Sequence, residues 1–208
     1  MDSLDVDLLQ FVAAHRSDEL TWVARAVMAI GTDVRVWAAG TLVALVATVA
    51  LRAWRVAATV AFSVLVTVAA AGVLKQLIDR ARPPADLALV HLAGPAMPST
   101  HAALSAAAGT AVFLALSPAL RRAYLGVLIA MVVLGIAACL VYLGVHWPTD
   151  ILAGWALGAA VATGTAVATR QVRRSRTRPQ ESDGTASRGP GSAHERSLRC
   201  RRHHPRQA

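Results

Sequence analysis

Three short stretches hold the residues of this chain that could carry out chemistry. They are KQLIDRARP at residues 75–83, MPSTH at residues 97–101 and YLGVHWPTD at residues 142–150. The ionisable and hydroxyl side chains of interest within them are Lys75, Arg82, Ser99, His101, His146 and Asp150. Lys75 is the only lysine of a chain that otherwise uses arginine as its strong cation. Two histidines, an acid and a pair of cations are groups that suit phosphoryl transfer.

These groups divide into two sets by the work they would do. Lys75 and Arg82 would neutralise the phosphoryl oxygens, while one histidine attacks phosphorus and the other protonates the leaving oxygen. His146 and Asp150 are four residues apart, so a helical turn would let the carboxylate reach the imidazole ring. Each residue also has an ordinary alternative role, as an anchor at a span end, a buried polar group or a helix cap. Their joint occurrence beside apolar runs favours one shared site.

Five apolar runs would position these residues. The chain is 55% hydrophobic and 16% charged, with a mean hydropathy of +0.49, which is too apolar for a typical soluble domain. A helix needs about 20 residues to cross a bilayer core. The runs close to that length are Val34–Leu51, Val56–Leu74, Ala102–Leu120, Ala123–Leu143 and Ile151–Thr169. We therefore predict an all-α integral-membrane bundle of five transmembrane helices, or six if the N-terminal segment also crosses.

The short loops predict the orientation of these spans. Arg52 and Arg55 would share one side with the arginines of residues 121–122 and with those of the C-terminal tail. Loops rich in arginine stay in the cytoplasm, so this side is predicted to be cytoplasmic. The loops at 75–101 and 144–150 then meet on the opposite face. The candidate site is therefore predicted to lie at the extracytoplasmic surface.

The two ends of the chain differ from its middle. Within residues 1–30, Leu8–Ile30 is apolar but interrupted by charges, which predicts one or two interfacial amphipathic helices or, alternatively, a broken sixth span. The acidic start lacks the features of a signal peptide, so we expect the spans themselves to direct insertion. Residues 170–208 carry eleven arginines against three acids and predict a disordered basic cytoplasmic tail, solvated or touching lipid headgroups. Because nearly all of the net charge of +9 lies there, we expect no nucleic-acid partner.

The three stretches together resemble a known family. The patterns K-x6-RP, PS-x-H and H-x3-D, in this order and separated by apolar spans, resemble the motifs of the type 2 phosphatidic acid phosphatase superfamily. Its members are integral-membrane lipid phosphatases whose active site is related to that of the vanadium haloperoxidases. The resemblance covers roughly residues 31–169, which we predict to form a membrane-embedded phosphatase domain.

The resemblance implies a role for each site residue. His146 would be the nucleophile that forms a phosphohistidine, Asp150 would fix its tautomer, and His101 would be the general acid. The phosphate oxygens would be bound by a set of donors comprising Lys75, Arg82, Ser99 and the backbone N–H of Thr100. Threonine at position 100 departs from the glycine usual in the family, but the N–H donor is retained. No metal ligand and no cofactor are implied.

One departure from the family pattern affects the expected activity. The third motif of the family opens with Ser-Arg, and the corresponding residues here are Cys139 and Leu140. The missing arginine would bind phosphate, and its loss corresponds to about 2–4 kcal/mol of transition-state stabilisation, or two to three orders of magnitude in rate. Arg80 could replace this cation if its side chain turns into the site.

The leading interpretation is a metal-independent phosphatase of a bacterial plasma membrane, acting on a lipid phosphate or diphosphate. Candidate substrates are a polyprenyl diphosphate, phosphatidic acid and phosphatidylglycerol phosphate, among which the sequence does not choose. The alternative is a weakened or inactive family member that binds lipid phosphates, which Cys139 and Leu140 favour and the intact histidine pair opposes. A small transporter is a third interpretation, but the chain has no internal repeat to support it. The sequence carries no signal for an oligomeric state.

Overall fold

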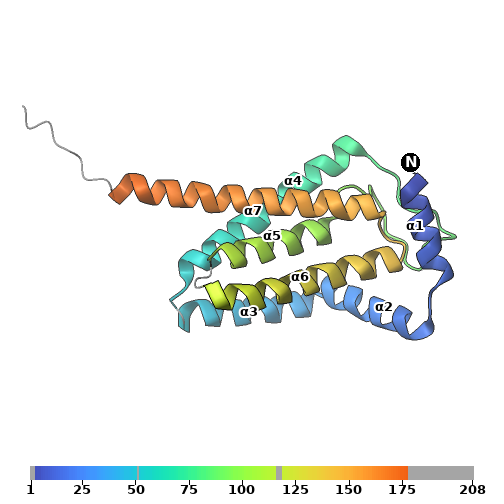
Figure 1. Cartoon of the computed structure of the whole chain (residues 1–208), viewed down its shortest axis with the longest axis horizontal. Coiled ribbons are helices and arrows are strands. Elements are labelled where there is room, and N and C mark those ends of the chain that lie inside the picture. Colours follow the sequence, from blue (N-terminus) through green and yellow to red (C-terminus); the bar gives the residue numbers. More distant parts are fainter. Residues whose placement is uncertain (1–2, 51, 116–118, 178–208) are drawn as a thin grey trace, which may run out of the picture.

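The structure, a computed structural model, describes residues 3–50, 52–115 and 119–177. Within these ranges all regular secondary structure is helical (Figure 1). The seven helices are α1 (Ser3–Ala14), α2 (Asp18–Thr32), α3 (Val34–Ala50), α4 (Trp54–Ile78), α5 (Thr100–Ala115), α6 (Ala119–Tyr142) and α7 (Pro148–Thr177). The predicted all-α fold is confirmed.

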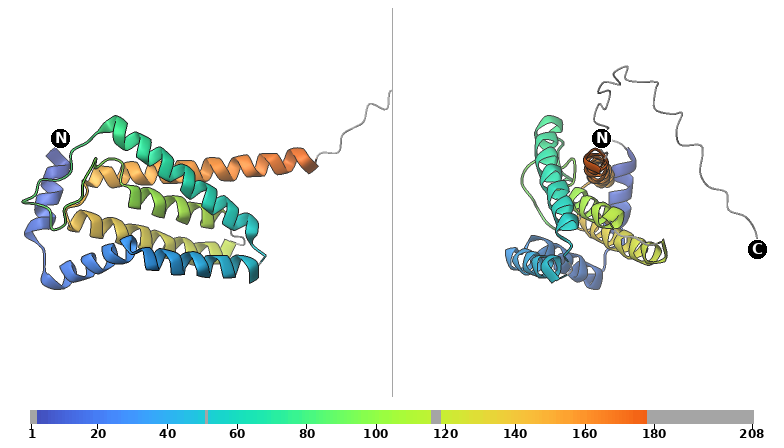
Figure 2. Two further views of the ribbon diagram at one scale, coloured as in Figure 1. Left: turned by 180° about the vertical axis from the view of Figure 1, so that it is seen from behind. Right: turned by 90° about the vertical axis from the view of Figure 1, so that its left-hand side faces the viewer.

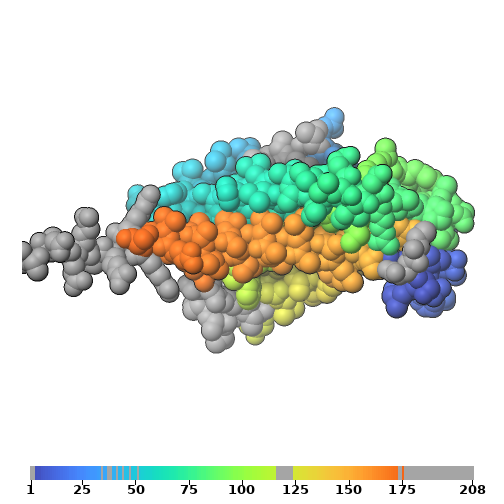
Figure 3. All heavy atoms as spheres, turned by 90° about the horizontal axis from the view of Figure 1, so that it is seen from above, coloured from blue at the N-terminus to red at the C-terminus, as the bar shows by residue number. Residues whose placement is uncertain are grey.

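Helices occupy all five places where spans are predicted. Three of them are long and apolar enough to cross a membrane, within Trp54–Ile78, Tyr124–Tyr142 and Pro148–Val172. α5 is equally apolar but has 16 residues, and α3 has 17. The helices α3, α5, α6 and α7 run roughly along the long axis of the molecule, and α4 crosses α7 obliquely (Figures 1 and 2). α4 and α7 are in contact and appear as neighbours when the molecule is seen from above (Figure 3).

The inside and outside of this bundle are reversed relative to a soluble protein. Large apolar side chains on the outer helix faces are exposed, for example Val43, Leu65 and Met131, each about two thirds accessible. Polar side chains such as Ser63 and Thr67 of α4 are instead fully buried. Their hydroxyls donate to carbonyl oxygens one turn earlier in the same helix. This distribution is the one expected for helices surrounded by lipid.

Glycine and alanine bring α5 and α7 close together. A Cβ atom at Gly154 would lie 2.6 Å from the carbonyl oxygen of Ser99, and one at Gly158 would lie 2.1 Å from that of Ala103. The buried residues of α5 are all alanine, namely Ala102, Ala103, Ala106, Ala107 and Ala111, and the first two lie beside Gly154 of α7. Small residues of this kind allow helix backbones to approach closely in lipid. This packing sets the beginning of α5 against the beginning of α7.

The N-terminal segment forms two helices, and neither is long enough to span a bilayer by itself. α1 lies across one end of the bundle, against the ends of α6 and α7 (Figures 1 and 2). α2 begins at the cap residue Ser17, packs beside α6, and is followed directly by α3 after Asp33. Two short helices separated at residues 15–17 are compatible with both predicted forms of residues 8–30, an interfacial pair and a broken sixth span, so both stay predictions.

The last helix is longer than predicted. α7 continues to Thr177, eight residues past the end of the predicted apolar span. The extra turns contain arginine and glutamine, which favour helix, and they end just before Arg178-Pro179, where proline disfavours helix for the residue in front of it. The rest of the predicted tail, residues 178–208, lies outside the described residues.

Candidate active site

The structure brings the three chemistry-bearing stretches to one end of the bundle. α4 ends there with Lys75 in its last turn, and the loop of residues 79–99 follows. α5 begins there with Thr100 and His101, and α7 begins there just after the turn of residues 143–147 that carries His146. The C-terminal end of α4 and the N-terminal ends of α5 and α7 meet at this end, beside α1 (Figures 1 and 2).

Asp150 joins His146 to the start of α7. Its Oδ2 atom lies 3.4 Å from Nδ1 of His146 and accepts a hydrogen bond of 2.9 Å from the backbone N–H of Trp147. Trp147 precedes the helix, Pro148 opens it, and Asp150 is its third residue, so the carboxylate closes the helix start in the manner of a capping box. The helix-cap role and the histidine-partner role are therefore filled by the same side chain.

The turn that carries His146 is tightly held. Gly144 has a positive φ of 69°, and a Cβ atom there would lie 2.4 Å from the carbonyl oxygen of Leu87. The N–H of Leu89 donates to the carbonyl of Leu143, and the buried indole of Trp147 donates to the carbonyl of Ala81. The loop of residues 79–99 is thereby fixed against the turn. A glycine is required at position 144 because no side chain fits between these backbones.

The surroundings of His146 favour its neutral form. The residue is 2% exposed, and burial lowers the pKa of its imidazole. The contact with Asp150 opposes this effect, while the charges of Arg82 and Lys75 add to it, and the net result is a lowered pKa. A neutral imidazole with Nδ1 directed at a carboxylate leaves its Nε2 lone pair available as a nucleophile.

Lys75 and Arg82 both donate to backbone carbonyl groups, and they share that of Pro95. Nζ of Lys75 donates to the carbonyls of Pro95 and Ala96, at 2.8 and 3.3 Å. The guanidinium of Arg82 donates to the carbonyls of Gly94 and Val145, each at 2.9 Å, and to that of Pro95 at 3.4 Å. Within the described part of the chain, neither cation forms an ion pair with a carboxylate. Their positive charge is therefore oriented by neutral partners and stays available to an anion.

The start of α5 supplies further donors. Ser99 is fully buried, its N–H donates to the carbonyl of Asp150 at 3.0 Å, and its hydroxyl caps the helix by accepting from the N–H of Ala102 at 3.5 Å. Thr100 opens the helix, so its N–H precedes the internal hydrogen-bond ladder. Helix N-termini attract anions through such donors and through the helix dipole.

His101 lies in the first turn of α5 and is partly buried. Lys75 and Arg82 both act electrostatically on this histidine, as they do on His146. The α2 helix also reaches it, because a Cβ atom at Gly31 would lie 4.0 Å from the ring carbon Cδ2. No sequence motif predicts this contact, because Gly31 lies in the N-terminal segment, outside the three chemistry-bearing stretches.

A second cluster of charges lies beside the one formed by Lys75, Arg82 and His146. The guanidinium of Arg80 donates to Oδ1 of Asp150 at 2.7 Å and to Oδ2 of Asp5 at 2.5 Å. Asp5 belongs to α1 and also accepts from Thr149, from its hydroxyl at 2.5 Å and from its N–H at 3.1 Å. Sequence analysis missed both Asp5 and Thr149. The acidic residues of the MDSLDVD start were the available signal, but sequence spacing does not connect them to residue 149.

The position expected to carry a third phosphate-binding cation, residue 140, has apolar surroundings. Leu140 is 3% exposed and packs in a cluster with Ala102, Ala137 and Ile151. Arg80, considered above as a replacement, directs its guanidinium to two carboxylates. The structure therefore leaves Lys75 and Arg82 as the cations that are not paired with acids around His146.

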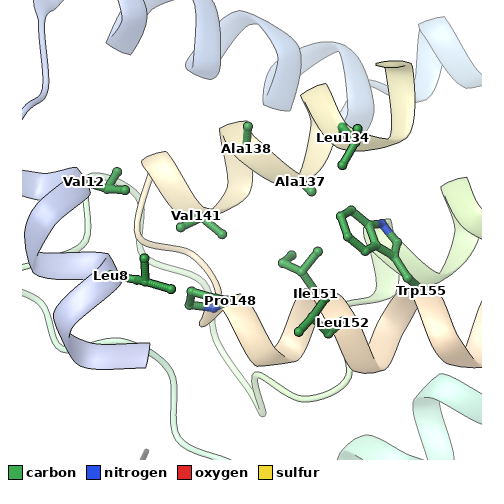
Figure 4. A pocket seen from close by; sticks show the side chains of 10 residues that line it. All are labelled: Leu8, Val12, Leu134, Ala137, Ala138, Val141, Pro148, Ile151, Leu152 and Trp155. Carbon is green, nitrogen blue, oxygen red and sulfur yellow. The ribbon is translucent and has the colours of Figure 1, made fainter. Parts of the chain in front are cut away.

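An apolar groove of about 380 Å³ lies next to the site, between α1, α6 and α7 (Figure 4). Its lining residues carry no ionisable group: Leu8, Val12, Leu134, Ala137, Ala138, Val141, Pro148, Ile151, Leu152 and Trp155. Such a lining suits hydrocarbon and not phosphate. The groove and the polar site share the beginning of α7, where Pro148 and Ile151 face the groove and Asp150 faces His146.

Comparison with known proteins gives matches at the level of family and fold. A family model of the PAP2 superfamily matches residues 52–174. The phosphatidylglycerolphosphate phosphatase of Bacillus subtilis, described as a transmembrane PAP2-type enzyme, superposes with a TM-score of 0.71 and 21% identity over 83% of this chain and 87% of its own. LpxE of Aquifex aeolicus superposes with a TM-score of 0.64 and 17% identity over 79% and 95% of the two chains. No curated protein sequence gives a significant match.

At these identities the two structures establish the fold, an all-helical arrangement shared with PAP2-type membrane proteins. The family model covers more than half of the chain and includes all three chemistry-bearing stretches. The resemblance stated from the motifs is confirmed: this chain belongs to the PAP2 superfamily.

Proposed function

We propose that this protein is a metal-independent lipid phosphatase that works through a phosphohistidine at His146. The observation that carries the proposal is a buried histidine whose Nδ1 lies 3.4 Å from Asp150, in the field of two cations that are bonded only to backbone carbonyls among the described residues. Family membership supports membrane phosphatase chemistry in general. The neighbouring enzyme from Bacillus subtilis acts on phosphatidylglycerol phosphate, and a lipid phosphate is the corresponding substrate class here.

The reaction has two displacement steps. In the first, Nε2 of His146 attacks phosphorus, a P–N bond forms, the P–O bond to the leaving group breaks, and His101 donates a proton to the departing oxygen. In the second, His101 takes a proton from water, the hydroxide attacks phosphorus, and the P–N bond breaks to release inorganic phosphate and neutral His146. Asp150, whose Oδ2 lies 3.4 Å from Nδ1, would accept the Nδ1–H as the ring gains charge and would balance that charge while the ring is phosphorylated.

The phosphoryl group gains negative charge on its equatorial oxygens during each step. Lys75 and Arg82 would exchange their carbonyl partners for these oxygens, and the N–H of Thr100 and the Ser99 hydroxyl would add donors at the start of α5. The proposed catalytic residues are thus His146, His101 and Asp150. The proposed phosphate-binding residues are Lys75, Arg82, Ser99 and Thr100.

The position of the site suits a substrate that remains in the bilayer. The site lies at one end of the helical bundle, so a phosphate headgroup could enter it while the attached chain stays at membrane depth. The apolar groove beside α7 provides a surface for part of such a chain. We assign the site to the extracytoplasmic face of a bacterial plasma membrane from the arginine-rich loops at the opposite end. Phosphatidic acid, phosphatidylglycerol phosphate and a polyprenyl diphosphate all meet these requirements.

A second candidate function is lipid-phosphate binding with little turnover. The burial of Leu140 in an apolar cluster favours it, because a cation expected at that position is absent. The contact between His146 and Asp150 supports catalysis, because binding alone does not require a nucleophile.

Phosphate release by the purified full-length protein in detergent separates the two candidates. The panel comprises phosphatidic acid, phosphatidylglycerol phosphate and a polyprenyl diphosphate, each with EDTA present. We expect release from at least one of them, inhibition by vanadate, and no release by His146→Ala. Binding of these lipids by a folded wild-type protein that releases no phosphate would select the second candidate. Activity that disappears in EDTA and returns with Mg²⁺ would contradict the proposed mechanism.

A further inference from the structure

Asp5 is an unusual residue for the first turn of an interfacial helix because its carboxylate is fully buried. The same helix exposes Leu4, Leu8 and Phe11, whereas Asp5 and Leu9 face the bundle. Burial alone would raise the pKa of Asp5, but hydrogen bonds from Thr149 and Arg80 outweigh it and lower that pKa. The side chain is therefore a buried carboxylate anion, which is costly unless it has a specific set of partners.

The partners of Asp5 lead directly to the proposed nucleophile. Oδ1 accepts from the N–H of Thr149, and Oδ2 accepts from the Thr149 hydroxyl and from Arg80. Arg80 reaches Oδ1 of Asp150, whose other oxygen faces His146. Every step of this path is 3.4 Å or shorter.

The charges along this path are one cation, Arg80, between two carboxylates, Asp5 and Asp150. Arg80 is shared by two carboxylates, so its single positive charge does not fully neutralise Asp150. If Asp5 were uncharged, Arg80 would interact with Asp150 alone and would reduce the negative potential that Asp150 exerts on His146. The hydrogen bonds would change as well, because Arg80 and Thr149 would lose an acceptor that holds them in place.

We propose that Asp5 and Arg80 are positioning residues of the active site, through which α1 holds Asp150 against His146. This inference rests on the proposed phosphatase function. It assigns Arg80 a role other than that of a substitute phosphate-binding cation. It also makes the N-terminal helix, which lies outside the segment matched by the family model, a part of the catalytic apparatus.

The proposal has a pH signature that a purely structural contact would lack. The charged groups acting on His146 are Asp150 of α7, Lys75 of α4 and Arg82 of the loop. Other ionisable groups at this end include His101 of α5, the Asp5–Arg80 pair, and Tyr142 of α6, whose hydroxyl is bonded to Ser17. Arg16 donates to the carbonyls of Tyr142 and Leu87, and the loop of residues 79–99 also carries Asp79, Asp86 and His91. His146 must be neutral to attack, so activity is lost on the acid side as this ring is protonated. Removing the charge of Asp5 disfavours the protonated ring of His146. The acid limb of the pH–activity profile, where activity falls as His146 is protonated, therefore moves to lower pH.

The test compares Asp5→Asn with Asp7→Asn, a matched change at an exposed aspartate on the same helix. Full-length proteins are assayed for phosphate release from the lipid panel above, with kcat/KM measured as a function of pH. For Asp5→Asn we expect turnover to fall by about tenfold to a hundredfold. We also expect its acid limb to move to lower pH by about half a unit or more. For Asp7→Asn we expect wild-type behaviour.

Arg80→Gln provides a second test that holds even if Asp5→Asn does not fold. Removing this cation strengthens the negative potential at His146, so its acid limb should move to higher pH, opposite to the effect of Asp5→Asn. If the wild type is active and the folded variants keep its acid limb, the inference is overturned and the proposed function stands. A wild type that releases phosphate from no lipid of the panel would overturn the proposed function, and this inference with it.

Discussion

Two clusters of charge lie side by side in this protein, and their cations have different partners. Lys75 and Arg82 donate to carbonyl groups of residues 94–96 and of Val145. Arg80, in the same loop as Arg82, donates to the carboxylates of Asp5 and Asp150. The three cations fall within eight residues of sequence, yet the structure separates them into an anion-accepting cluster, Lys75 and Arg82, and a cation already paired with two carboxylates, Arg80.

The difference shows why the partners of a cation are more informative than its position in a motif. A cation bonded to neutral dipoles can exchange them for phosphate oxygens with a gain in Coulomb energy. A cation that already bridges two acids would have to lose those ion pairs first. Burial alone would lower the pKa of Arg80, but its contacts with Asp5 and Asp150 raise that pKa, whereas burial lowers the pKa of Arg82. The two arginines are thus predicted to respond differently to substitution.

The largest effect is expected for His146→Ala, which removes the proposed nucleophile. Turnover should fall by a factor on the order of ten thousand or more. The measurement is phosphate release from the lipid panel in EDTA. His91→Ala is a suitable control because His91 is an exposed histidine in the loop of residues 79–99. If His146→Ala were as active as His91→Ala, His146 would not be the nucleophile.

A substantial effect is expected for Lys75→Gln and Arg82→Gln, which remove the anion-accepting cations one at a time. Each should lower kcat/KM by about two to three orders of magnitude, because a donor to the transition-state charge is lost. Each should also weaken inhibition by vanadate. Arg80→Gln should lower turnover but leave the vanadate inhibition constant nearly unchanged. If Arg80→Gln weakened vanadate binding as much as Arg82→Gln, the distinction between the clusters would be wrong.

A moderate gain is expected for Leu140→Arg. The cluster around Leu140 includes Ala102 and Ile151, the neighbours of His101 and Asp150, so a longer cationic side chain could extend into the anion-accepting cluster. We expect turnover of the folded protein to rise about tenfold and the thermal midpoint to fall, because the apolar cluster is overpacked and receives a charge. Leu140→Met controls for packing without the charge. A well-folded arginine variant no faster than the parent would indicate that no third cation is needed.

The wild-type pH profile gives a smaller but direct test of the environment of His146. Its pKa is lowered from the ordinary value of 6.5 by burial, and the neutral ring is the reactive form. The acid limb of kcat/KM should therefore lie below pH 6.5, with activity lost as the pH falls through the pKa of the folded enzyme. An acid limb above pH 6.5 would mean that Asp150 outweighs burial and the nearby cations.

The smallest effect is expected for removal of residues 178–208. The basic tail is predicted to lie on the face opposite the site, and α7 is retained to its last residue, Thr177. Turnover on the lipid panel should stay within about twofold of the full chain, as is usual for changes that leave the packed body intact. A large loss from a folded truncated protein would contradict the predicted topology and the separation of the tail from the site.

The sequence by itself determined the class of fold and most of the residues of the candidate site. Apolar runs of nearly bilayer length predicted helices at the correct places, because the hydrocarbon core leaves no other partner for backbone polar groups. The four-residue separation of His146 and Asp150 predicted their contact, because a helical turn brings such residues together. α7 continues to Thr177, eight residues past the end of the predicted apolar span, because apolarity marks the membrane span and not the end of the helix.

Only the tertiary structure decided how the charges are paired. Asp5 lies 75 residues from Arg80 and 144 residues from Thr149, and no periodicity connects positions so far apart. The partner of Arg80 depends on where α1 crosses the bundle, and the burial of Leu140 depends on how α5, α6 and α7 pack. Local patterns determine which groups are present at one end of a bundle, but their electrostatic roles depend on neighbours that only packing brings within hydrogen-bond distance.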